Sequence, residues 1–127
     1  MKKRVLADTN IWIDYFNGDS DIADKLEQLI KKGAVFITGP VIYELLQGAK
    51  TSDTIQTLIE TLNAVHYLDS SKRHWEKAGI LSSDLRRKGI TIPMSDILIS
   101  VIAAENNCMI FTQDSHFKSI PGVTLYK

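Results

Sequence analysis

Four acidic residues occupy positions from which their side chains could do chemistry together. Each lies where a short apolar run ends or where the helical pattern after it begins: Asp8, Glu44, Asp96 and Asp114. Ligands of open parallel sheets bind outside the carboxyl ends of the strands, so acids at such points should converge. Convergent carboxylates repel one another, and they either raise their pKa values or recruit a divalent cation. The spacing therefore predicts a cation-binding carboxylate cluster.

The residue types favour magnesium or manganese at such a cluster. Both ions prefer oxygen ligands, whereas zinc prefers cysteine and histidine. The sequence has one cysteine, no close pair of histidines and no HisGluXaaXaaHis run. An oxygen-ligated cation polarises a phosphoryl oxygen and helps to deprotonate the water that attacks a phosphodiester. The expected chemistry is phosphodiester hydrolysis.

Three of the acids also have a purely structural explanation. Asp8 can cap the helix that begins at Asn10 or Ile11, and Asp114 can cap a short helical turn. Asp96 lies in the first turn of a helix, where an acid favours the helix dipole. Capping and metal binding both stay open for these residues.

Glu44 is the most informative acid. It lies within a short helical pattern of apolar residues, where a buried lone carboxylate is costly unless it is paired or bound to a metal. We therefore expect Glu44 to be at least partly shielded from solvent; the alternative is a glutamate at the edge of the apolar stripe. The stripe consists of Val41, Ile42, Leu45 and Leu46.

Short apolar runs alternate with amphipathic stretches, which predicts an α/β fold. After Pro93, only Ser100 is polar between Ile97 and Ala104, so that helix should be buried on most of its circumference. Strands separated by helices imply parallel pairing. We expect a three-layer α/β/α sandwich with a mainly parallel sheet, in a single domain over 1–127. Strands are expected at 4–7, 34–38, 64–68, 108–112 and 122–126, and further helices at 20–32, 40–46, 51–62 and 71–88.

Composition limits the class of protein. The 127 residues, 44% hydrophobic and 24% charged, suit one compact domain. The net charge of zero argues against binding nucleic acid by bulk electrostatics, so the placement of charges must matter more than their total. No apolar run is long enough for a membrane span and no cleavage-site pattern follows the N-terminus, which predicts a cytoplasmic protein. The lone Cys108 should be a buried structural thiol.

Four short motifs, in order along nearly the whole chain, resemble those of a PIN domain. They are AspThrAsn at 8–10, ValIleTyrGluLeuLeuGlnGly at 41–48, IleProMetSerAspIleLeuIle at 92–99 and ThrGlnAspSerHisPhe at 112–117. Within that family, the chain is most similar to the VapC-type toxin ribonucleases of bacterial toxin–antitoxin modules. The resemblance implies a PIN-like fold and an endoribonuclease activity that depends on magnesium or manganese.

The same resemblance implies roles for residues and for partners. Thr112, and with it Asn10 and Ser95, would orient carboxylates or water at the metal. A homodimer would be expected, as would inhibition by a small VapB-type antitoxin whose C-terminal segment occupies the active-site groove. By this resemblance the metal would be held by Asp8, Glu44, Asp96 and Asp114.

Five further residues are candidates for RNA contact. Two are Lys72 and Arg73, at the start of a predicted helix, and two are Arg86 and Arg87, in its last turn, where cations are also favourable without a ligand. The fifth, His116, stands where many PIN relatives carry another acid, so a second metal site does not follow at this position. His116 would contact a phosphate or lie at the surface.

Rival classes fit the acids less well. A phosphoacceptor receiver domain would need extra acids adjoining the first strand and a lysine ending the last, and it leaves Glu44 unexplained. A phosphatase of the haloacid dehalogenase type would need AspXaaAsp, which Asn10 breaks. A non-catalytic PIN-like RNA- or protein-binding module remains the alternative, although such modules commonly lose acids.

Overall fold

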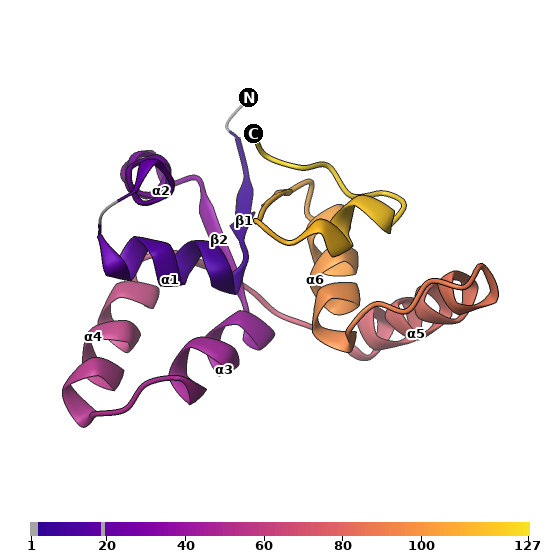
Figure 1. Ribbon diagram of the computed structural model, residues 1–127, viewed down its shortest axis with the longest axis horizontal. Helices are drawn as coiled ribbons and strands as arrows, with labels where there is room; N and C mark the ends of the chain where they lie inside the picture. The colour runs from indigo at the N-terminus through magenta and orange to yellow at the C-terminus, as the bar shows by residue number, and fades with distance from the viewer. Residues whose placement is uncertain (1–2, 19) are drawn as a thin grey trace.

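The computed structural model describes residues 3–18 and 20–127, and its centre is a parallel sheet (Figure 1). The strand order is β3-β2-β1-β4, with all neighbours parallel. Val5 in β1 pairs with Val35 on one side and with Met109 on the other, which places β1 inside the sheet. The strands are β1 (Val5–Ala7), β2 (Val35–Thr38), β3 (His66–Leu68) and β4 (Met109–Phe111).

Helices cover both faces of the sheet, as the predicted α/β/α sandwich requires. In Figure 1, the first four helices lie on one side of the strands and the last two on the other. In the described part of the chain, none of these helices is long and apolar enough to cross a membrane. The helices are α1 (Thr9–Asn17), α2 (Asp21–Lys31), α3 (Gly39–Gln47), α4 (Ser52–Leu62), α5 (Lys72–Arg87) and α6 (Met94–Glu105), and a 3-10 helix, η1, spans Ser115–Ser119.

The prediction of a fifth strand at 122–126 is wrong. The chain turns at Pro121 and Gly122 and then reaches β4 at one isolated parallel bridge, between Ile110 and Leu125. Two backbone bonds form it: Ile110 donates to the carbonyl of Thr124 at 2.8 Å, and Tyr126 donates to Ile110 at 2.9 Å. Because only Ile110 and Leu125 are bridged, this segment borders β4 without forming a continuous ladder.

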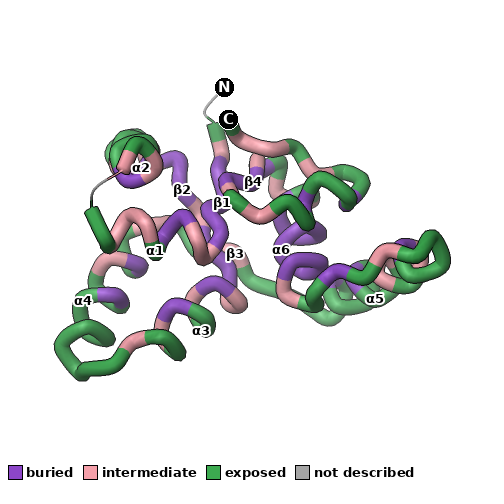
Figure 2. The backbone as a smooth tube through the Cα atoms, in the orientation of Figure 1, coloured by how far each residue is buried: buried purple, intermediate pink, exposed green. Residues whose placement is uncertain are grey.

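The buried helix after Pro93 is confirmed as α6. Every residue from Asp96 to Ala103 is buried (Figure 2). One side of α6 packs on β4 and another on α5, so apolar residues are needed around most of the helix. Because α6 is fixed in this way, Asp96 in its first turn is held at a defined position.

The single cysteine lies in the core, as expected. Cys108 is buried at the end of the connection from α6 to β4. Burial raises the pKa of its thiol, and the nearby Arg4 only partly opposes this effect. A buried thiol that stays protonated is a poor nucleophile, which fits a structural residue.

Candidate active site

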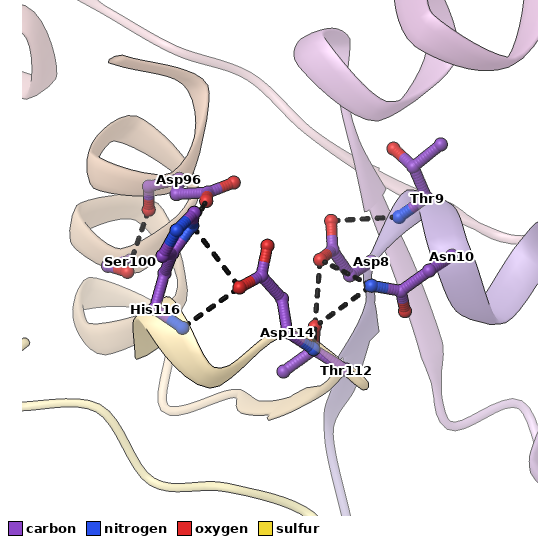
Figure 3. Close-up of polar contacts among 8 residues, drawn as sticks. All are labelled: Asp8, Thr9, Asn10, Asp96, Ser100, Thr112, Asp114 and His116. Carbon is purple, nitrogen blue, oxygen red and sulfur yellow. Dashed lines mark hydrogen bonds and ion pairs between the residues drawn. The ribbon is translucent and has the colours of Figure 1, made fainter. Parts of the chain in front are cut away.

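The structure brings the four acids together at the carboxyl end of the sheet. Asp8 follows β1, Asp114 follows β4, Asp96 lies in the first turn of α6 and Glu44 lies in α3. Figure 3 shows the carboxylates of Asp8, Asp96 and Asp114 facing a common space. The negative charges of Glu44 and Asp114 raise the pKa of Asp8, and those of Asp8 and Asp114 raise the pKa of Asp96, so these groups lie near one another. The convergence expected from the spacing is therefore present.

Asp8 both caps a helix and belongs to the cluster. It is only 5% exposed. Its Oδ1 accepts from the backbone N–H of Thr9 at 2.8 Å, which caps α1. Its Oδ2 accepts from the hydroxyl of Thr112 at 2.8 Å and faces the amide of Asn10 at 3.4 Å. The two explanations of this residue are compatible, because each carboxylate oxygen has more than one lone pair.

Thr112 links the two strand ends that carry Asp8 and Asp114. Its hydroxyl donates to Asp8 and accepts from the backbone N–H of Asp114 at 3.0 Å. Asn10 ties the same two segments, since its Oδ1 accepts from the backbone N–H of Gln113 at 3.1 Å. These bonds fix the orientation of Asp8 relative to Asp114.

Glu44 is not buried within the apolar stripe of α3 but lies at its edge, the alternative that the sequence left open. Glu44 is exposed, and its Oε1 accepts from the hydroxyl of Thr9 at 2.8 Å. The core-facing side of α3 is occupied by Val41 and Leu45, which leaves Glu44 on the flank of the helix. It therefore stands at the rim of the cluster rather than inside it.

His116 contacts two of the acids at once. Its Nδ1 lies 3.1 Å from Oδ2 of Asp96 and 3.2 Å from Oδ1 of Asp114 (Figure 3). Its backbone N–H also donates to Oδ1 of Asp114 at 2.9 Å, which caps η1. These three residues each offer a ligand atom within 4.8 Å of the others. The donor set of the site is thus carboxylate oxygen with one imidazole nitrogen.

Burial and mutual repulsion raise the pKa values of Asp8 and Asp96. Burial is the largest effect that raises the pKa of Asp8, followed by the charges of Glu44 and Asp114, while the bonds from Thr112 and Thr9 oppose it. Burial also raises the pKa of Asp96, and His116 partly opposes the change. A bound cation would relieve this repulsion. The arrangement is therefore one that could hold a divalent metal ion.

The raised pKa values make the stability of the metal-free protein depend on pH. Between the ordinary pKa of an aspartate and the raised one, the folded state binds more protons than the unfolded state. Stability then falls as pH rises through that window and stays low above it. We expect the unfolding temperature of wild type in EDTA, minus that of Asp8→Asn, to decrease from about pH 4 upward and then level off. A difference that rises with pH would contradict the shift.

Among residues 3–18 and 20–127, the four basic candidate residues do not pair with the acids, and Ser95 is not hydrogen-bonded to them. Arg73 pairs with Oε1 of Glu105 at 2.7 Å. Arg87 pairs with Asp84, and Lys72 lies 3.9 Å from Glu76. Neither these three nor the exposed Arg86 pairs with any of the four acids, and Ser95 forms no hydrogen bond with them; all of these residues are described. The sequence did not reveal the internal partners of Arg73 and Arg87.

A groove lies beside the cluster, and sequence reasoning did not predict its apolar wall. Its volume is about 520 Å³, and its lining includes Glu44 and Ser95. The exposed side chains of Tyr43, Trp75 and Met94 form much of its apolar wall. The sequence gives one indication of this apolar wall, since Tyr43 directly precedes Glu44 and Met94 directly precedes Ser95. The sequence gave no such indication for Trp75, because its spacing predicts a place on the core-facing side of α5, whereas its side chain is exposed in the structure.

Comparison with known proteins identifies the family. The family model for the PIN domain matches residues 5–123. Ribonuclease VapC11 of Mycobacterium tuberculosis is 30% identical over 126 residues, covering 94% of this chain and 93% of that protein. Ribonuclease VapC2 of Rickettsia felis is also 30% identical over 126 residues, covering 94% of each.

Solved structures agree. The crystal structure of VapBC2 from Rickettsia felis bound to a DNA fragment from their promoter contains a chain with a TM-score of 0.81 and 26% identity, with 96% of each chain covered. The DNA-bound VapBC from Salmonella typhimurium, at 20% identity and a TM-score of 0.79 with 98% and 97% covered, shows the same fold. The chain belongs to the PIN domain family and, within it, to the VapC ribonucleases.

Proposed function

We propose that this chain is an endoribonuclease that depends on magnesium or manganese, the toxin of a VapBC-type toxin–antitoxin module. The observation that carries the proposal is the convergence of Asp8, Asp96 and Asp114 from three separate elements, with Glu44 at the rim. Two of these carboxylates are buried and have raised pKa values, a combination typical of functional sites. The names of the relatives supply the substrate class, which is RNA.

The donor set suits the ion. The ion would be held by Asp8, Asp96 and Asp114. Glu44, at the rim beside the groove, would add a further negative charge near the ion. When bound, a divalent cation neutralises charge on the phosphate and lowers the pKa of the attacking water. The chain itself supplies orientation: Thr112 and Asn10 hold Asp8, and Thr9 holds Glu44. Ser95, which lines the groove, would contact the substrate strand.

The role of Thr112 gives a testable prediction. Thr112→Val keeps the shape but removes the bond that lowers the pKa of Asp8, and it leaves the N–H of Asp114 without that acceptor. We expect activity to fall by roughly 10- to 100-fold, as when partners of metal ligands are lost. The acidic limb of the pH–rate profile should also move to higher pH. Thr112→Ser should restore both, and a fully active Thr112→Val with an unchanged profile would remove Thr112 from the site.

The partners follow from the same assignment. The RNA strand would lie in the groove beside Glu44, with secondary contacts to Lys72, Arg73, Arg86 and Arg87. We infer a VapB-type antitoxin and a second copy of the chain as protein partners, in the cytoplasm. The exposed apolar residues around the groove support a protein contact, since such patches commonly mark interfaces. The whole chain, 1–127, would act as a single domain.

The test is cleavage of a mixed cellular RNA pool by the purified protein. The arms are magnesium, manganese, EDTA, and Asp8→Asn with each metal. Asp53→Asn in the first turn of α4 is the matched control, because it removes an exposed acid that is not one of the four acids of the cluster. We expect discrete fragments that require both a metal and Asp8, and normal cleavage by Asp53→Asn. If folded wild type cleaves nothing and binds no cation, the chain is instead a non-catalytic binding module.

A further inference from the structure

We propose that Nδ1 of His116 is a direct ligand, beside Asp96 and Asp114, of the cation that the acidic cluster holds, and that this nitrogen makes the site favour manganese over magnesium. The inference rests on the proposed function only in that the acids hold a cation. It adds a ligand that is not an acid, and it chooses between two ions that the carboxylates alone do not distinguish.

The distances between the donor atoms fit one ion. Neighbouring ligands of an octahedral cation with bonds of about 2.1 Å lie roughly 3.0 Å apart. Nδ1 of His116 lies 3.1 Å from Oδ2 of Asp96 and 3.2 Å from Oδ1 of Asp114. Nδ1 is therefore spaced from each carboxylate oxygen as a neighbouring ligand would be, and all three atoms lie within 4.8 Å of one another.

The imidazole is held in place by the fold. Asp114 caps η1 and accepts from the backbone N–H of His116, so the two side chains are fixed relative to each other. The next residue, Phe117, is buried in the core and anchors the short helix. On the other side, Asp96 is fixed by the buried helix α6. The side chain of His116 remains 45% exposed, which leaves room for water or a phosphate oxygen on the same ion.

The chemistry of the ligands separates the two ions. Magnesium prefers oxygen ligands in a strict octahedron and keeps several waters, whereas imidazole suits first-row transition ions better. Replacing one oxygen donor by a nitrogen therefore lowers the affinity of the site for magnesium relative to its affinity for manganese. The competing arrangement is a His116 that only forms ion pairs with Asp96 and Asp114 and is displaced when a cation binds.

The experiment measures metal binding without RNA, so it does not depend on cleavage. Calorimetric titration of the metal-free full chain gives the affinities for Mn²⁺ and Mg²⁺ in wild type, His116→Asp and His66→Gln. His66 is the matched control: it is an exposed histidine of β3 whose Nε2 contacts the carbonyl of Gly33. Pulsed electron paramagnetic resonance of bound Mn²⁺ reports directly whether a nitrogen is coordinated.

We expect wild type and His66→Gln to show a coordinated nitrogen and a ratio of Mn²⁺ to Mg²⁺ affinity on the order of tenfold above that of His116→Asp. The nitrogen signal should be absent from His116→Asp. A wild-type signal without coordinated nitrogen overturns the inference even if His116→Asp fails to fold, and so does an equal affinity ratio in the folded variant. If cations bind without a coordinated nitrogen and RNA is cleaved, the proposed ribonuclease function stands and the inference about His116 fails. If no cation binds, the proposed function and the inference both fail.

Discussion

Replacing Asp8 with asparagine should reduce metal-dependent RNA cleavage at least about 100-fold, since a cation ligand contributes several kcal/mol to stabilising the transition state. The substitution changes the charge and almost none of the volume. Asp8 lies at the centre of the bonding network, between the cap of α1 and the hydroxyl of Thr112. Its asparagine variant can keep an acceptor for the N–H of Thr9 while losing the charge that a cation needs. The measurement is the rate of appearance of discrete RNA fragments in saturating metal.

The same variant should remain folded, and without metal it should be at least as stable as wild type. The reason is that Asp8→Asn removes the repulsion from Glu44 and Asp114 and the cost of burying a charge. Addition of metal should raise the unfolding temperature of wild type and have little effect on the variant, as ligand binding to the folded state requires. Asp96→Asn should behave alike. A folded Asp8→Asn protein that cleaves RNA at the wild-type rate would refute the assignment of this acid.

The second large effect concerns the helix that positions Asp96. Ile99→Ala should lower the free energy of unfolding by about 3 kcal/mol, the usual range for truncating a buried isoleucine being roughly 2–5 kcal/mol. Ile99 is 0% exposed in the fully buried part of α6, between the sheet and α5, so the cavity left by the change has little freedom to collapse. Denaturant unfolding gives the difference, and the midpoint should fall without a large change in slope.

Ile80→Ala in α5 is the matched control for that change. Ile80 is 64% exposed, so the same truncation should alter the free energy of unfolding by less than about 0.5 kcal/mol. Similar losses in the two variants would mean that α6 is not buried in solution, or that α5 buries Ile80 against a partner in solution. Measuring Ile80→Ala at two protein concentrations separates these explanations, because only the second depends on concentration.

The sequence by itself determined the layered fold and which acids gather. Alternating strand and helix patterns require parallel crossovers, and the carboxyl ends of parallel strands meet at one edge. Asp8 and Asp114 follow adjacent strands for this reason. The position of Asp96 followed from chain order, since the helix that holds it in its first turn leads directly into β4, the strand that ends before Asp114. These inferences depend on local spacing, which the sequence records directly.

Only the tertiary structure decided how each side chain is surrounded. Glu44 is exposed because the neighbouring turns of α3 already present Val41 and Leu45 to the core. Arg73 is drawn to Glu105 of α6, a partner 32 residues away in the sequence. His116 meets Asp96 and Asp114 because η1 follows β4 beside the start of α6. Burial and ion pairing depend on which elements pack together, so residues distant in sequence fix them and no local pattern reports them.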